Sequence, residues 1–210
     1  MKRAPVFTDL SRLTKALRVW YIIAAAVSLE TLVENLRVYW LVNHAPQHEF
    51  TRSETIWQYG IYIASLLLTA ITFITFMVWV FKSYRNARLI SAEATTSPAM
   101  AVVYYYIPFL SLYKPYQHMQ EVWKICASPT DWRAQKNSSV VIAWWSLFLV
   151  SAFVELAAQR SEPTDQETSL TVYNIYYLLN ASSEFIKAAY YGISVLLLGR
   201  LWERMKVYAP

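Results

Sequence analysis

The sequence has little charge, almost no glycine and a single cysteine. Only 16% of its 210 residues are Asp, Glu, Lys or Arg, whereas soluble domains have roughly 25%. Its 3 Gly provide no glycine-rich phosphate-binding loop, and Cys126 alone excludes an internal disulfide. No local nucleophile signature is visible, so an enzyme is the least supported class. Since one thiol cannot hold zinc without histidines, and the apolar runs contain none, we expect no metal and no cofactor.

Hydrophobic residues make up 56% of the chain and gather into four long runs. Each run can cross ~30 Å of hydrocarbon as a helix with a rise of ~1.5 Å per residue. We therefore expect transmembrane helices over residues 17–42, 56–81, 140–158 and 170–202. The predicted fold class is an all-α integral membrane protein, built as a single polytopic membrane domain over residues 1–210.

A fifth apolar stretch, residues 100–112, is too short to be a span. As a helix it would reach only ~20 Å, and Pro108 interrupts its hydrogen-bond ladder. We expect a re-entrant or interfacial hairpin within a cytoplasmic-side connection over residues 82–136. The first twenty residues lack the apolar core of a signal peptide, so residues 1–16 are expected to remain as an interfacial helix.

The basic residues support four spans. Fifteen of the nineteen Lys and Arg lie in the N-terminal segment, the 82–136 connection and the C-terminal tail, which four spans place on one side. The positive-inside rule then predicts that both termini are cytoplasmic. The same distribution accounts for the net charge of +5, and because the basic residues are interspersed over several faces, we expect no nucleic-acid binding.

One segment carries a family resemblance. It contains Tyr84-Arg85-Asn86, then Ser97-Pro98, then Pro108, then Lys114-Pro115-Tyr116-Gln117, and closes with Glu121 and Trp123. This pattern resembles the bacterial membrane family DUF4328, a domain of unknown function, most clearly between Trp79 and Trp145. The resemblance implies a multi-pass protein of the bacterial inner membrane and implies no particular activity.

The same motif has a physical interpretation. Pro115 precedes Tyr116, Met119, Val122 and Trp123, whose helical spacing predicts an amphipathic helix over residues 116–127 on the cytoplasmic surface. Lys114 is expected to reach lipid phosphate, and His118 to be solvated. The segment is either a simple membrane-hugging connector or a site for a bound lipid or partner. The candidate binding residues are Arg85, Ser97, Pro98, Pro108, Lys114, Pro115, Tyr116, Gln117, Glu121 and Trp123.

A second candidate site consists of charges within the expected spans, which cost at least ~2.5–3.5 kcal/mol each unless they are paired. The residues are Glu30, Glu34, Arg37, Glu155, Glu184 and Lys187. Two of the possible pairs, Glu34 with Arg37 and Glu184 with Lys187, are three residues apart and can share a helix face. Glu30 and Glu155 have no such local partner. They must be protonated, paired across helices, or bound to a cation or water.

Two functions follow from these sites. The leading hypothesis is a non-enzymatic binding or accessory module whose Pro- and aromatic-rich hairpin forms the working surface. The alternative is a small proton- or cation-coupled transporter or channel that uses the intramembrane glutamates, as an oligomer because four spans leave little room for a pathway. The expected partners are the lipid bilayer, with a bound lipid, a homo-oligomer or a larger membrane complex left open.

Overall fold

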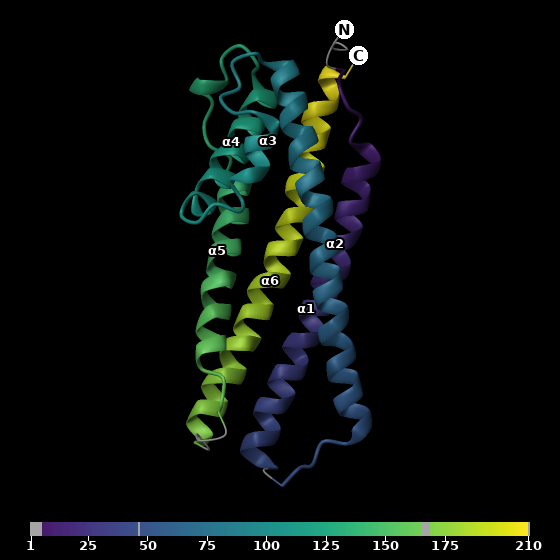
Figure 1. The fold of residues 1–210 in the computed structure, drawn as a ribbon, viewed down its shortest axis with the longest axis vertical. Coiled ribbons are helices and arrows are strands. Elements are labelled where there is room, and N and C mark those ends of the chain that lie inside the picture. Colours follow the sequence, from purple (N-terminus) through teal and green to yellow (C-terminus); the bar gives the residue numbers. More distant parts are fainter. Residues whose placement is uncertain (1–5, 46, 165–168, 210) are drawn as a thin grey trace. The chain divides into compact units, whose positions relative to one another are not determined.

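The computed structural model describes residues 6–45, 47–164 and 169–209, which are mostly helical and contain no strand (Figure 1). The long helices are α1 (Ser11–His44), α2 (Arg52–Ile90), α5 (Ser139–Arg160) and α6 (Leu170–Met205). The predicted all-α class is therefore confirmed. The shorter elements are α3 (Pro98–Val103), η1 (Leu110–Leu112), α4 (Lys114–Ala127), η2 (Trp132–Ala134) and η3 (Lys206–Tyr208).

Within the described residues, three helices are long and apolar enough to cross a membrane, namely α1, α2 and α5. They contain the first three expected spans. Helix α6 covers the fourth and has 36 residues, but it carries Glu184 and Lys187 near its middle. The stretch 100–112 forms no continuous helix, because α3 ends at Val103 and only the short η1 follows.

The chain forms two compact units, and each long helix contributes to both of them. Unit 1 comprises residues 1–20, 71–145 and 193–210, and unit 2 comprises residues 21–70 and 146–192. Fifteen Lys and Arg are predicted to share one side of the membrane, and the thirteen of them that the structure describes all fall within unit 1. The three basic segments are thus parts of one folded body.

The N-terminal segment packs onto α2 within unit 1. The buried Asn86 side chain accepts a hydrogen bond from the Thr8 backbone N–H at 2.9 Å and donates one to the Thr8 carbonyl at 2.8 Å. The Trp79 indole N–H donates to Thr14 Oγ1 at 2.9 Å, and Leu10 and Leu17 are fully buried. The expected interfacial segment over residues 1–16 thus contacts α2 through its described part, and α1 begins within it at Ser11. Its place at the membrane interface stays a prediction, and residues 1–5 lie outside the described residues.

Helix α4 covers the amphipathic helix expected over residues 116–127 and packs one of its faces into unit 1. Its buried face includes the apolar Met119, Val122 and Ile125, and it also includes polar side chains. Gln120 bonds to the backbone of Ser138 in both directions, accepting from its N–H at 2.8 Å and donating to its carbonyl at 3.0 Å. Because Ser138 directly precedes α5, this pair, which we call the Gln120 clasp, fixes the start of α5 against α4.

Candidate functional site

A buried carboxylate joins three segments of unit 1. Glu121 of α4 is 6% exposed and accepts a hydrogen bond from the Tyr84 hydroxyl of α2 at 2.5 Å. Thr95, between α2 and α3, donates its backbone N–H to Glu121 at 2.6 Å and its hydroxyl at 2.9 Å. The Thr96 N–H in turn donates to the Tyr84 oxygen at 3.2 Å. We call Tyr84, Thr95 and Glu121 the Glu121 latch, because it holds the chain before α3 against α2 and α4.

His118 lies beside this latch. Its ring centroid is 5.5 Å from that of Tyr84 and 5.3 Å from that of Tyr104, and its Nδ1 atom is buried without a hydrogen-bond partner. Burial lowers the pKa of His118; Glu121 opposes this shift and Lys114 adds to it. Burial also raises the pKa of Tyr84, helped by its hydrogen bond to Glu121. The prediction of a solvated His118 is wrong, because α3 and the preceding turn cover this face of α4.

Several motif residues shape the backbone. Ser97 caps α3 by accepting the Met100 N–H at 3.2 Å, and Pro98 occupies its first turn. Pro115 occupies the first turn of α4 and is buried, while Gln117, two residues further on, is exposed.

The other motif residues contact separate parts of unit 1. Arg85 donates to the Val6 carbonyl and to the Thr8 hydroxyl, so it holds the N-terminal segment. The Tyr116 hydroxyl lies 3.4 Å from Asn137 Nδ2, and Trp123 lies under Arg204. The motif therefore does not form one pocket.

An exposed aromatic segment follows α3. Phe109 is 81% exposed and has a positive φ of 63°, which is rare for a bulky residue, and Tyr106 is 62% exposed. The backbone of this segment is anchored at Leu112, whose carbonyl accepts the Trp145 indole N–H at 2.8 Å. Lys114 Nζ lies 5.8 Å from the centroid of the Tyr104 ring and 5.5 Å from that of Tyr113. We call residues 104–113 the aromatic tip.

A basic groove of about 970 Å³ lies elsewhere in unit 1, between the start of α1 and the end of α6. Its charged side chains are five cations and two carboxylates, a net charge of +3. The Arg204 guanidinium carbon lies 4.1 Å from the centroid of the Trp123 ring. The charged lining residues are Asp9, Lys15, Arg18, Arg200, Glu203, Arg204 and Lys206.

In unit 2, Lys187 of α6 is bound by two glutamates. Its Nζ lies 3.0 Å from Glu184, three residues earlier on the same helix, and 3.1 Å from Glu155 of α5. The expected same-face pair is present, and Glu155 is paired across helices. This triad carries one excess negative charge and joins α5 to α6.

A second ionic group links α1 to the start of α2. Arg37 Nη1 lies 3.0 Å from Glu34, the pair that the spacing predicts, and Arg37 also pairs with Glu54. Gln58 donates to Glu34 at 2.9 Å. Thr51 and Glu54 form a capping box at the start of α2, in which the Thr51 N–H and hydroxyl donate to the Glu54 carboxylate and the Glu54 N–H donates to Thr51 Oγ1. The bonds from Thr51, together with the bond from Arg37, lower the pKa of Glu54 to about 2.

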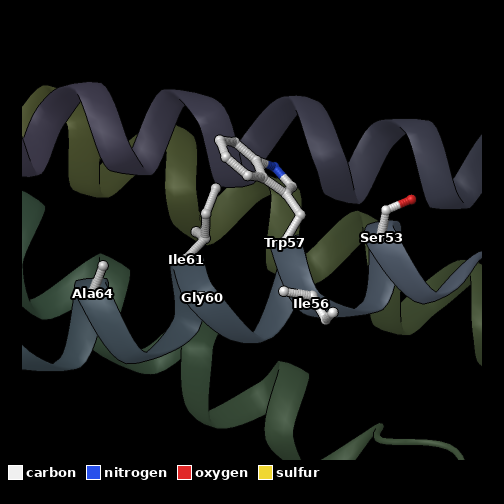
Figure 2. Close-up of a pocket in the computed structure, with 6 residues that line it drawn as sticks. All are labelled: Ser53, Ile56, Trp57, Gly60, Ile61 and Ala64. Atoms are coloured by element: carbon white, nitrogen blue, oxygen red, sulfur yellow. The ribbon is translucent and has the colours of Figure 1, made fainter.

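Glu30 differs from these paired carboxylates. It accepts the Trp57 indole N–H at 3.1 Å, while its other oxygen, Oε2, is buried without a hydrogen-bond partner. Figure 2 shows the Trp57 ring leaning from α2 toward the neighbouring helix, over an apolar groove of about 570 Å³ that includes Gly60 and Ile61. The orphan oxygen makes Glu30 the least satisfied charge among the candidates.

The acidic, histidine and cysteine side chains of the described residues do not gather into one site. Across residues 6–45, 47–164 and 169–209, no three His, Cys, Asp or Glu side chains converge to hold a metal ion. Burial raises the pKa of Cys126 to about 12, so the thiol stays protonated near neutral pH.

The fold and these sites define a helical protein with membrane-length apolar helices, a basic unit and ion-paired charges within the expected spans. The family model for a domain of unknown function, DUF4328, matches residues 45–202, so the chain belongs to this family. Comparison with curated proteins and with solved structures finds no match.

The sequence did not single out several residues that the structure brings together. Thr95 had no local signal, since an isolated threonine in a loop is ordinary. Arg18 and Gly199 meet only through the fold. Gln120 had a weak signal, because an amide on the buried side of a helix requires hydrogen-bond partners.

Proposed function

We propose that this chain is a non-enzymatic, lipid-binding accessory module of the bacterial inner membrane, with four transmembrane helices and both termini in the cytoplasm. A helix as long as α6, with 36 residues, exceeds ~30 Å of hydrocarbon. Its central Lys187 is paired with two carboxylates, which reduces the cost of placing α6 across the membrane as the fourth span.

The observation that carries the proposal is the aromatic tip. Two of its aromatic side chains are largely exposed, Phe109 at 81% and Tyr106 at 62%, although the backbone of the tip is anchored at Leu112. Aromatic rings with a neighbouring lysine are typical of the membrane interface, where rings enter the acyl boundary and the ammonium stays with the phosphates. We infer that the tip enters one leaflet beside Lys114, and that lipid contact there is the working interaction.

A depth measurement tests this proposal. In a Cys126→Ser background, Phe109→Cys carries an environment-sensitive fluorophore, and the protein is placed in lipid nanodiscs. We expect a blue-shifted emission that lipid-attached quenchers suppress, because the tip lies in the leaflet. Lys136→Cys, an exposed position in the polar linker before α5, is the matched control and should emit as in water. Equal emission from both positions would refute insertion of the tip.

Loss of lipid contact should follow loss of the rings. Tyr106→Ser combined with Phe109→Ser should reduce the number of lipids that survive gentle detergent extraction, measured by native mass spectrometry. The control is Phe50→Ser with Tyr208→Ser, which removes two exposed rings that lie outside both the tip and the expected spans. An unchanged lipid number in the tip variant would contradict a lipid-binding role.

The orphan oxygen of Glu30 favours one alternative, a proton- or cation-coupled transporter or channel that works as an oligomer. A carboxylate with an unsatisfied buried oxygen is suited to hold a proton or a cation within the bilayer. Proteoliposomes with an internal pH or cation indicator test this function. Flux that is present in the parent chain and lost in Glu30→Gln, but kept in the exposed control Glu49→Gln, would support it. Absence of flux over a panel of ions would exclude it.

A further inference from the structure

The basic groove of unit 1 has the charge of an anion-binding site. Both of its lining carboxylates already have partners. Asp9 accepts the Ser11 N–H at 2.8 Å and the Ser11 hydroxyl at 2.9 Å, and Glu203 pairs with Lys206. Among the residues that the structure describes, no carboxylate forms an ion pair with Arg18, Arg200 or Arg204. These three guanidinium groups share one groove, and none of them is neutralised by an ion pair among the described residues.

Gly199 gives one of these groups its position. A β-carbon placed on Gly199 would lie 3.6 Å from Cζ of Arg18, and 3.7 Å from both its Nε and Nη1. The guanidinium of Arg18 therefore rests directly against the α6 backbone, beside Arg200. Alanine would still fit at ordinary contact distance, but a β-branched side chain extends one bond further and would displace Arg18.

The lining changes from apolar to basic along α6. Val195 and the half-exposed Leu196 come first, Gly199 and Arg200 follow one turn later, and Arg204 comes another turn on. An amphiphile with an anionic head requires this order, whereas a soluble anion has no use for the apolar end. Guanidinium groups bind phosphate oxygens with paired hydrogen bonds, so a phosphate group suits the basic end.

We propose that this groove binds the phosphate headgroup of an anionic phospholipid, with Arg18, Arg200 and Arg204 at the phosphate and an acyl chain along Val195 and Leu196. The site is distinct from the aromatic tip and goes beyond the function proposed above. It gives the protein a preference for lipid charge, which the tip alone does not provide. Its occupation would also hold the start of α1 against the end of α6.

The test uses the full chain in detergent and native mass spectrometry, with titration of phosphatidylglycerol, phosphatidylcholine or inorganic phosphate. We expect phosphatidylglycerol to bind at least 10-fold more tightly than either of the others. Arg18→Gln with Arg200→Gln should remove roughly 10-fold or more of this affinity, since each cation near a lipid phosphate contributes about 1 kcal/mol. Arg88→Gln with Lys136→Gln, which removes two exposed cations of the same unit outside the groove, should not change it.

A second pair of variants guards against loss of folding. Gly199→Val keeps every charge but displaces Arg18, and should weaken phosphatidylglycerol binding, while Gly199→Ala should bind like the parent. Equal binding of phosphatidylcholine, equal binding of inorganic phosphate, or full affinity in Arg18→Gln with Arg200→Gln would each overturn the proposal. None of these results bears on the fluorophore at position 109, so failure of the groove and failure of the aromatic tip can be told apart.

Discussion

The Glu121 latch allows a quantitative prediction for Tyr84→Phe. The substitution removes only the hydroxyl that donates to Glu121 at 2.5 Å and accepts from Thr96, and it keeps the buried ring. A hydrogen bond to a charged group contributes roughly 1.5–3 kcal/mol to stability. We therefore expect the free energy of unfolding to fall by about 2 kcal/mol, which for a chain of this size lowers Tm by about 4–8 °C.

The assay is thermal unfolding of purified protein in one detergent, followed by intrinsic fluorescence. Tyr106→Phe is the matched control, because it removes a hydroxyl from a tyrosine that is 62% exposed. Surface changes of this kind alter stability by about 0.5 kcal/mol or less. If Tyr84→Phe and Tyr106→Phe melted together, the reasoning that Glu121 holds three segments through these bonds would be refuted.

A double-mutant cycle sharpens the result. Glu121→Gln weakens the acceptor, and combining it with Tyr84→Phe should destabilise the protein by less than the sum of the single changes. For directly bonded groups the coupling energy is typically about 0.5–3 kcal/mol. Additive effects would mean that the two side chains act independently, in spite of the contact between them.

Two further predictions concern buried titratable groups of α4. Burial lowers the pKa of His118, so as the pH falls through about 6.5 the unfolded chain binds a proton at this residue that the folded chain does not bind. The contribution of neutral His118 to the free energy of unfolding is therefore fully present above that pH, and it decreases below it by up to about 1.4 kcal/mol per pH unit. Chemical unfolding between pH 7 and 5 should show this slope in the parent and a smaller one in His118→Phe, and equal slopes would contradict it. The buried Cys126 should react with a water-soluble maleimide only on unfolding, whereas Ala127→Cys in a Cys126→Ser background, one exposed residue further, should react at once. Rapid labelling of folded Cys126 would show that its thiol is accessible.

The long helices could be predicted because an apolar run of membrane length has few other ways to satisfy its backbone. The pairs Glu34–Arg37 and Glu184–Lys187 could be predicted too, since three-residue spacing on a helix fixes them locally. The cross-helix partner of Glu155 was one of several open possibilities, and only the packing of α5 against α6 selects it.

The buried polar groups of α4 could not be predicted. Helical periodicity shows which residues share a face, but it does not show what covers that face. Here Thr95 and the following α3 cover His118 and Glu121, so the face of α4 that carries them is buried. The basic groove was hidden for a similar reason, because Arg18 and Gly199 lie near opposite ends of the chain.

The Gln120 clasp has a practical consequence for engineering the protein. Since Gln120 bonds to the Ser138 backbone in both directions, α4 and α5 remain attached through side-chain contact as well as through the covalent linker between them. The peptide bond between the exposed Thr130 and Asp131 is then not needed to align the two helices. An epitope tag or a protease site inserted there should leave both helices in register, which makes this linker a suitable entry point for labels.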